Sequence, residues 1–528
     1  MINKKTYYNL LSEISSEELF DGLLGHGLFA DKIPPFLSSE SFLDFCKNPP
    51  NGFNFEVKPA RYVKYENMRN INIPRILSIP NPIAYYNLCN VLSNNWMELL
   101  TYFYEKTKNN THKVSRIHIR KIEDSLNILD SCYDNLDEID LDDYSNNIQS
   151  HLFEMNHKNF CVDDYPEPSL QIASKYIVKA DISNCFPSMY SHSLCWALVG
   201  KTISKSNRDK NEWFNKIDKY TRNLKDAETH GFLIGPHASN LLSEIILIAV
   251  DEELHAKGYK YIRNVDDYTV YLESRDRADE FLVILASELR KYNLTLNHKK
   301  TEILASAEHW VRKLSGHVFV MTDEDKLGLK TTRAYLDIAI ELMQENKENS
   351  AILNYTIKVL SKKEMTSFSK DYFLKTVHHL VLLYPYLVTL LDENIFERFN
   401  ISTDEIEIIS KSIFELGTKE DLFESMSYAL YFSIKYNFIL DTDLFDKVKE
   451  SNDSILLLLS YLHDEKFIND SEVTTKYKVL ARLLKEDIDE YWIFIYEVLG
   501  SNDLARYWSN MKKENITFIK EEFGVKNV

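Results

Sequence analysis

Residues that interrupt regular structure are scarce in the second part of this 528-residue chain. Twelve of the 13 prolines precede residue 240, and only Pro385 follows; nine of the 13 glycines precede residue 320. Because both residue types break helices and shape tight turns, their scarcity excludes a turn-rich β architecture for that part. It favours long helices there, after a first part built from turns and short elements.

Paired cysteines and long apolar runs are also missing. None of the six cysteines forms a close C-x-x-C pair with matching histidines, which argues against a zinc site. The longest apolar run, residues 455–462, is far shorter than the roughly 18–20 residues that cross a bilayer. Residues 1–17 are polar and broken by charges, unlike a signal peptide. We therefore expect a cytoplasmic protein with reduced thiols and no membrane partner.

The chain lacks an excess of positive charge, since its net charge is −18 and its pI is about 5.4. This balance argues against a protein whose whole surface binds phosphates, but a local basic groove stays compatible with it. Two stretches rich in lysine and arginine, residues 113–121 and 201–225, could line such a groove. The acidic residues 123–143 are interpreted as a solvated helix or loop.

Apolar residues recur at three- and four-residue spacing beyond residue 330, which predicts helices. The expected helices are residues 334–344, 351–362, 372–391, 406–416, 422–436 and 474–484. Ser402-x-x-Glu405 and Thr418-x-x-Asp421 are expected to begin helices. We predict an all-α domain over residues 326–528, either a HEAT-like array of helical hairpins or an irregular bundle.

Acidic residues lie at the ends of predicted strands in the first part. Strands are expected at residues 176–182, 261–264 and 268–272, with Asp181 ending the first. Asp266 and Asp267 lie in the tight turn between the other two. Adjacent carboxylates repel each other, and a bound cation would relieve the repulsion. A lone Asp-Asp pair is usually a surface turn, so the order of motifs carries the interpretation.

Five segments resemble motifs of the reverse-transcriptase family. They are Pro74-Arg-Ile-Leu-Ser-Ile-Pro80, Asp181-Ile-Ser-Asn-Cys-Phe186, Gly231-Phe-Leu-Ile-Gly-Pro-His-Ala-Ser-Asn-Leu-Leu-Ser-Glu244, Arg263-Asn-Val-Asp-Asp-Tyr268 and Leu296-Asn-His-Lys-Lys-Thr301. The resemblance implies an α+β fold of the right-hand type over residues 1–325, with fingers and a palm that contains an antiparallel sheet. It also implies a nucleotidyltransferase that takes dNTPs as substrates.

The resemblance also assigns metal ligands. Asp181 and Asp266 would bridge two Mg²⁺ ions, with Mn²⁺ as an alternative metal. Asp267 would assist, and the carbonyl of Ile182 would complete one coordination shell. Lys300 matches the lysine that protonates the leaving pyrophosphate, although an ordinary surface lysine is the alternative interpretation.

Five residues match nucleotide contacts of the family, and Ile182, named above, is one of them. Arg75 would grip the incoming triphosphate, since a guanidinium fits phosphate oxygens. Phe186 would crowd a ribose 2′-hydroxyl and so favour deoxynucleotides; core packing is the alternative. Gly235, followed by Pro236, would let the backbone approach the nucleotide closely.

Two departures from the family pattern bear on templating. The family usually has a glutamine immediately before the glycine that aligns with Gly235, whereas this chain has Ile234 there. Two positions before the Asp pair the family usually has an aromatic residue, whereas this chain has Asn264. Loss of that glutamine puts ordinary template reading in doubt. The acids themselves are intact, so catalysis is still expected.

Within the family the chain is most similar to the bacterial abortive-infection (Abi) polymerases of the type carried by P2-like prophages. The similarity lies in Gly231-x-x-x-Gly-Pro-x-x-Ser-Asn240, in Tyr190-Ser-His-Ser193 and in the helical tail. It implies phage defence by untemplated DNA synthesis from a protein tyrosine, a covalently attached single-stranded product, and homo-oligomers (trimers or hexamers). Tyr7 and Tyr8 are candidate priming residues.

Two other interpretations stay open from the sequence. A templated reverse transcriptase could copy a dedicated non-coding RNA held by the basic stretches. A non-enzymatic helical scaffold with a decayed palm is the second, and the intact acids speak against it.

Overall fold

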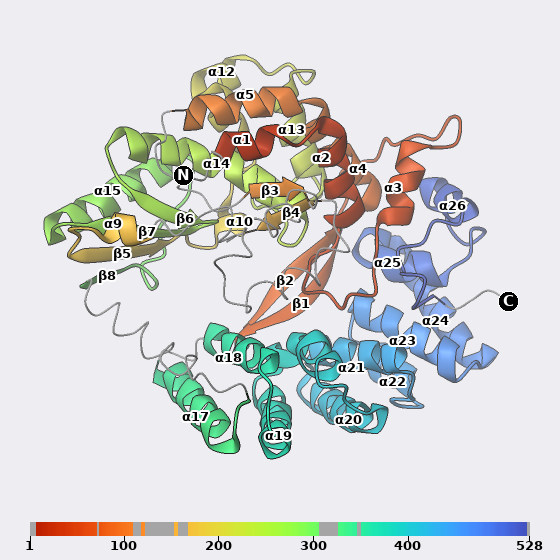
Figure 1. Ribbon diagram of the computed structural model, residues 1–528. Coiled ribbons are helices and arrows are strands. Elements are labelled where there is room, and N and C mark those ends of the chain that lie inside the picture. Colours follow the sequence, from red (N-terminus) through yellow and green to blue (C-terminus); the bar gives the residue numbers. More distant parts are fainter. Residues whose placement is uncertain are drawn as a thin grey trace.

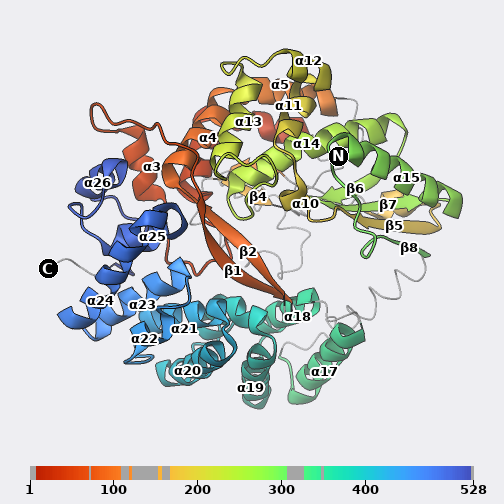
Figure 2. The same cartoon turned by 180° about the vertical axis from the view of Figure 1, so that it is seen from behind.

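The computed structural model describes residues 7–70, 73–108, 118–121, 153–156, 167–305, 326–345 and 350–524. The described residues up to 305 form one lobe, here called the sheet lobe. Those from residue 326 form an arc of helices, here called the helical arc, on the other side of a long β-hairpin (Figures 1 and 2). The hairpin reaches from the sheet lobe to the arc.

A four-stranded antiparallel sheet lies in the sheet lobe. Its strands are β5 (Tyr176–Asp181), β6 (Tyr261–Asn264), β7 (Asp267–Leu272) and β8 (Glu302–Ala305), in the order β6-β7-β5-β8. The predicted strands and the antiparallel pairing are thus confirmed. Helix α15 (Arg275–Lys291) contacts β5 and β7, whereas Ile177 packs on the other side with Ile262, Tyr271 and Leu170. Alternating side chains of β5 therefore have cover on both faces.

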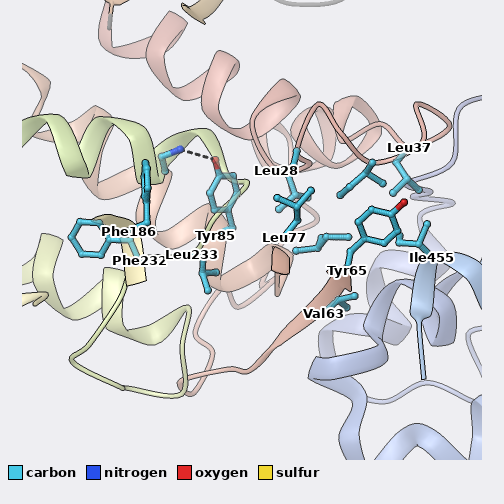
Figure 3. Packing of buried hydrophobic residues seen from close by; sticks show 14 of the residues in the cluster. Leu28, Leu37, Val63, Tyr65, Leu77, Tyr85, Phe186, Phe232, Leu233 and Ile455 are labelled. Carbon is cyan, nitrogen blue, oxygen red and sulfur yellow. Dashed lines mark hydrogen bonds between the residues drawn. The ribbon is translucent and has the colours of Figure 1, made fainter. Parts of the chain in front are cut away.

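The long hairpin pairs β1 (Tyr62–Asn70) with β2 (Ile73–Pro80) as a separate two-stranded sheet. Val63 and Tyr65 in β1 are opposite Ile79 and Leu77 in β2, and all four are buried. Figure 3 shows Tyr65 and Leu77 between residues of the first forty positions and Ile455 of the arc. Because an isolated hairpin is barely stable in water, this packing is what holds it.

The remaining elements of the sheet lobe surround these two sheets. A second small hairpin joins β3 (His118–Lys121) to β4 (Phe153–Asn156). The helices are α1 (Tyr7–Ser12), α2 (Ser16–Asp21), η1 (Gly22–His26), α3 (Glu40–Lys47), α4 (Pro82–Asn94), α5 (Trp96–Thr107), α9 (Glu167–Gln171), α10 (Cys185–Ser188), α11 (His192–Val199), α12 (Lys201–Ser206), α13 (Trp213–Asn223) and α14 (His237–Ala256).

The described residues from 326 onward contain helices and connecting turns, as predicted. The helices are α17 (Leu329–Glu345), α18 (Ser350–Lys362), α19 (Ser367–Leu383), η3 (Pro385–Leu390), η4 (Asp392–Glu397), α20 (Thr403–Glu420), α21 (Phe423–Tyr436), α22 (Leu444–Val448), α23 (Ser454–Phe467), α24 (Ser471–Leu483), η5 (Leu484–Asp487), α25 (Ile488–Val498) and α26 (Arg506–Lys513). Helix α20 packs on α21, α21 on α23 and α23 on α25, so helices that are close in sequence also lie close in space.

Two local predictions in the arc are wrong. Residues 372–391 do not form one helix, because Pro385 cannot continue the hydrogen-bond ladder and α19 ends at Leu383. Thr418 does not begin a helix either. It lies inside α20, where its hydroxyl donates to the carbonyl of Phe414, and Asp421 ends that helix in a left-handed conformation. The predicted start at Ser402 is confirmed, since its hydroxyl accepts from Glu405 N.

The two lobes share one hydrophobic core, which runs from Leu11 to Phe523. The end of the chain returns to its beginning: Leu37 bridges Ile519, and the Phe518 ring contacts Phe29 and Phe42. The division at residues 325 and 326 stays a prediction, since residues 306–325 lie outside the described part. Within the described residues the two lobes pack as one body.

Candidate active site

The three predicted acids lie together at one end of the central sheet. Asp181, the last residue of β5, is opposite Asp267, the first residue of β7. Ile182 N donates to the carbonyl of Asp266 at 3.3 Å, which brings the turn beside the end of β5. Asp181 is buried, whereas Asp267 is exposed. The sequence order of the motifs thus predicted a real convergence in space.

The turn that carries Asp266 is strained. Val265 has a φ of +54°, in the left-handed region that β-branched residues rarely adopt. The guanidinium of Arg263 donates to the carbonyl of Val265 at 2.8 Å. This bond fixes the residue that immediately precedes the two acids.

Arg263 is itself held by a buried cluster of charges. Its side chain, 0% exposed, donates to Glu244 of α14 at 2.8 and 3.0 Å and to Asp251 at 2.6 Å. The hydroxyl of Tyr261 also donates to Asp251. The two carboxylates keep the pKa of Arg263 well above its ordinary value despite the opposing effect of burial. The sequence motif contained Arg263 and Glu244 but gave no sign that they meet.

The acids raise one another's affinity for protons. The pKa of Asp267 rises to about 6, first because neighbouring protein atoms shield part of its carboxyl from water although the residue is exposed overall, and then because of the charges of Asp266 and Asp181. The pKa of Asp266 also rises, through burial and Asp181, with Lys300 and Arg75 acting in the opposite direction. A set of mutually repelling carboxylates is a donor set that a hard divalent cation would stabilise.

Lys300 provides positive charge at this place. Its ammonium lies 2.6 Å from Asp181 Oδ2, although half of its side chain is exposed. Within the described residues, no three His, Cys, Asp or Glu side chains are grouped closely enough to count as a metal cluster. The roles of Asp181, Ile182, Asp266 and Asp267 as metal ligands stay predictions.

Asn297 is a site residue that sequence reasoning missed. Its backbone N donates to the carbonyl of Asp181 at 2.8 Å, and its side-chain amide lies 3.3 Å from Asp181 Oδ1. Its own carbonyl accepts from Lys300 N. The signal was available in the motif Leu296-Asn-His-Lys-Lys-Thr301, three residues before the lysine, but its partner could not be read from spacing.

Comparison with known proteins identifies a domain within the chain. Residues 113–339 match the family model described as Reverse transcriptase (RNA-dependent DNA polymerase). The chain carries a reverse-transcriptase domain. It is therefore a nucleotidyltransferase, a DNA polymerase of the reverse-transcriptase family. No curated protein matches the chain. A solved structure of apo telomerase from Candida tropicalis is similar at 11% identity and a TM-score of 0.26, over 82% of this chain and 71% of that chain, too distant to support an argument.

Phe186 follows Asp181 by five positions in the reverse-transcriptase domain. It occupies the first turn of α10 and is 8% exposed. Its carbonyl accepts from Phe232 N, and Figure 3 shows its ring beside Phe232. This contact ties the first motif to the second. Burial is compatible with both interpretations of Phe186, so its role as a steric gate stays a prediction.

Gly235 has a conformation that explains the glycine. Its φ is +128°, and a Cβ there would come within 3.2 Å of the Ser78 carbonyl and of the Ala30 side chain. The missing side chain therefore lets the second motif approach strand β2, a reason that the sequence did not suggest. Pro236 follows as the residue before α14. Contact of either residue with a nucleotide stays a prediction.

The two residues that depart from the family pattern, Ile234 and Asn264, both lie in the described part of the domain. Ile234 is half-buried, and its carbonyl accepts from Ser78 N of β2 at 2.8 Å. Arg75, also in β2, is half-buried on the same face of the hairpin as Asn67. Asn264 ends β6, and its Oδ1 is buried with no hydrogen-bond partner in the part of the chain that the structure describes.

The priming candidates lie at the start of α1. Tyr8 is half-buried, and its ring meets the edge of Tyr104 with centroids 5.0 Å apart. The side chain of Tyr7 lies outside the described part, as do residues 113–117 of the first basic stretch and the whole acidic stretch 123–143. In the described part, no helix has the length and apolar character that crossing a membrane requires.

Proposed function

We propose that this chain is an antiphage DNA polymerase of bacterial abortive infection, which polymerises dNTPs without a template from a tyrosine hydroxyl of the protein. The observation that supports catalysis most is the meeting of Asp181 with Asp266 and Asp267 at one end of the sheet. In this proposal the sheet lobe provides palm and fingers, and the helical arc is a HEAT-like array. The proposed location is the bacterial cytoplasm, and the trimer or hexamer comes from the family resemblance alone.

Asp181 and Asp266 would hold two Mg²⁺ ions, with Mn²⁺ as an alternative, and Asp267 and the Ile182 carbonyl would assist. When bound, the metals would activate the attacking hydroxyl and stabilise the departing pyrophosphate. Asn297 would keep Asp181 oriented through its two hydrogen bonds. Lys300, which bonds Asp181 Oδ2 in the structure, would move away from that oxygen when a metal binds it. Its ammonium would then donate a proton to the leaving pyrophosphate.

The nucleotide would lie between the hairpin and the acids. Arg75 is close enough to lower the pKa of Asp266, so its positive charge acts at the same place as the acids. A guanidinium there suits a triphosphate, and Phe186, five positions after Asp181, would crowd a 2′-hydroxyl.

Ile234 supports the absence of templating. Its aliphatic side chain cannot donate or accept the hydrogen bonds that a glutamine amide makes to a nucleotide and its template. Its backbone is instead engaged with β2 through Ser78. Polymerisation would then depend on the triphosphate and sugar contacts, which are the same for every base.

The test is incorporation by the purified chain with Mg²⁺ and labelled dNTPs, without template or primer. The proposal predicts a labelled product that partitions with protein in phenol and becomes extractable after proteinase treatment. Incorporation that requires an added primer–template, or a product free of protein, would contradict it. The variants Tyr7→Phe and Tyr8→Phe then test which tyrosine primes, because removing the priming hydroxyl should abolish product formation.

A templated reverse transcriptase that carries a dedicated non-coding RNA is the second candidate. The described basic stretch favours it, because Lys201 lies 4.1 Å from the centre of the Trp196 ring and Lys219 lies 5.0 Å from that of Tyr220. Exposed cations beside aromatic rings suit nucleic-acid binding. Sequencing the nucleic acid that co-purifies from cells decides, since one abundant RNA with matching cDNA supports this candidate.

A further inference from the structure

A buried carboxylate of the helical arc bonds the hairpin that carries Arg75. Glu424, in the first turn of α21, is 1% exposed, and so is Asn67 of β1. Asn67 Nδ2 donates to Glu424 Oε1 at 2.5 Å, and Met68 N donates to Glu424 Oε2 at 2.7 Å. Both carboxylate oxygens therefore serve one edge of the hairpin.

Asn67 and Arg75 are direct cross-strand partners. Their side chains lie on the same face of the two-stranded sheet, because opposite residues of an antiparallel pair point the same way. Such partners have Cβ atoms about 4.5–5.5 Å apart. Glu424 thus fixes the neighbour of the residue proposed to bind the triphosphate.

The other edge of the hairpin bonds the second motif. Ser78 N of β2 donates to the Ile234 carbonyl, and Gly235 has no side chain where β2 passes. A continuous path of hydrogen bonds therefore runs from Glu424 through β1 and β2 to the loop before α14. A two-stranded sheet with open edges is otherwise free to shift, and these bonds limit that freedom.

The base of the hairpin is tied to the arc at other points, which do not involve Arg75's neighbour. Asn81 Nδ2 donates to Asp489 at 3.0 Å and to the Tyr507 hydroxyl at 2.7 Å, and Trp492 Nε1 donates to the Ile79 carbonyl. The base is therefore anchored independently. Glu424 acts further along the hairpin, level with Arg75.

We infer that Glu424 is a positioning residue for nucleotide binding: from the helical arc, it holds strand β1 so that Arg75 on β2 points at the triphosphate. This inference rests on the proposed nucleotide role of Arg75. It gives the arc a part in substrate affinity.

The test measures the Kd of a fluorescent dATP analogue with Mg²⁺, and the thermal midpoint, for the full chain. Glu424→Ala leaves two donors unsatisfied and should raise Kd by about tenfold. Asn67→Ala removes one of the two bonds and should raise Kd in the same direction. The double variant should add little to Glu424→Ala alone, because Glu424→Ala already removes the contact with Asn67.

The Kd of the Glu424→Gln variant for the dATP analogue should stay within about twofold of the wild-type value, a difference of less than about 0.5 kcal/mol. Among the described residues Asn67 Oδ1 has no hydrogen-bond partner, so the amide of Asn67 can turn and accept from the new glutamine. Rescue by glutamine would show that hydrogen bonding, and not the bulk of the side chain alone, matters.

Asp464→Asn is the matched control. Asp464 is equally buried in the arc and bonds His463 and Tyr477, not the hairpin. It should lower the thermal midpoint and leave Kd unchanged. A Kd for Glu424→Ala at the wild-type value, or an equal rise in Asp464→Asn, would overturn the inference.

The Arg75→Ala variant separates this inference from the proposed function. Loss of affinity in Arg75→Ala without loss in Glu424→Ala rejects the positioning role alone. Normal affinity in Arg75→Ala rejects the proposed triphosphate contact. Absence of binding by the wild-type chain would reject both.

Discussion

At the scale of single residues, three carboxylates meet where strand β5 and the turn before β7 converge, and their charges repel one another. Burial and mutual repulsion raise the pKa of Asp266 and Asp267, while Lys300 offsets part of the repulsion. Such an arrangement stores electrostatic free energy that a divalent cation can release on binding. Asn297 adds orientation to Asp181 without adding charge.

Phe186 provides a prediction about sugar selection. Phe186→Val should lower the preference for dNTPs over rNTPs by about 10- to 100-fold, because a smaller side chain leaves room for a 2′-hydroxyl. The measurement is kcat/KM for dATP and for ATP with the same protein. Phe232→Val, in the same buried cluster, is the control for lost packing. An equal change of preference in both variants would assign Phe186 to the core.

Sequence alone predicted which acids lie together better than it predicted the contacts that hold them. Asp181, Asp266, Asp267 and Lys300 belong to short motifs whose residue types chemistry restricts, and the structure brings all four together. Asn297 and Arg263 stood in the same motifs without an assigned partner. Their contacts span 116 residues in one case and 12 and 19 in the other, and only the folded chain determines such pairs.

At the scale of elements, the turn between β6 and β7 depends on a buried ion cluster. Arg263→Ala should lower the free energy of unfolding by about 3–5 kcal/mol, because it leaves the buried charges of Glu244 and Asp251 without their cationic partner. Urea denaturation measures the change. Arg275→Ala, which breaks an exposed pair with Asp279, should change it by only about 0.3–0.5 kcal/mol. Similar losses in the two variants would contradict this role of Arg263.

The predicted start of a helix was right where the side chain of one residue determines it, and wrong where tertiary packing determines it. Ser402 begins α20 because its hydroxyl caps the first turn, as the sequence suggested. Thr418-x-x-Asp421 has the same pattern but lies where α20 continues to Glu420. Packing of α20 on α21 outweighs the weak local signal there. The end of α19 before Pro385 is predictable from the sequence, because proline interrupts a helix through its own backbone.

At the scale of the whole molecule, the two lobes meet through contacts that no local pattern contains. Asn67 and Glu424 are 357 positions apart, and Asn81 and Tyr507 are 426 apart. The pattern of apolar residues predicted helices in the arc but not which of them would receive the hairpin. Strand β1 contacts α21, α23 and α25, so the arc supports an element of the sheet lobe.

The Glu424 contact also predicts a pH dependence of stability. Burial raises the pKa of Glu424 from an ordinary 4.5 to about 8, with Met68 N, Asn67 and Lys32 acting against the rise. The folded chain thus keeps a proton that the unfolded chain loses above pH 4.5. The free energy of unfolding should fall as pH rises from about 4.5 to about 8, by about 1.4 kcal/mol for each unit of pKa difference.

Glu424→Gln should flatten that fall, as measured by urea denaturation at pH 5, 7 and 9. The neighbouring hydroxyls of Tyr65 and Tyr428 have pKa values raised well above their ordinary value and stay neutral over this range. Asp453, whose pKa burial raises to about 7, contributes in the same direction in both proteins and leaves a residual slope. Equal slopes for wild type and variant would show that Glu424 does not titrate with folding.

The central claim is that the three acids form the catalytic centre, and Asp266→Asn tests it most directly. The initial rate of dNTP incorporation, measured with Mg²⁺ both with and without a primer–template, should fall by about a thousandfold or more, because the variant loses a charge that holds the metals. The thermal midpoint should not decrease, since asparagine keeps the shape and removes repulsion. A rate within a few-fold of the wild type, from a variant that is folded, would contradict the account.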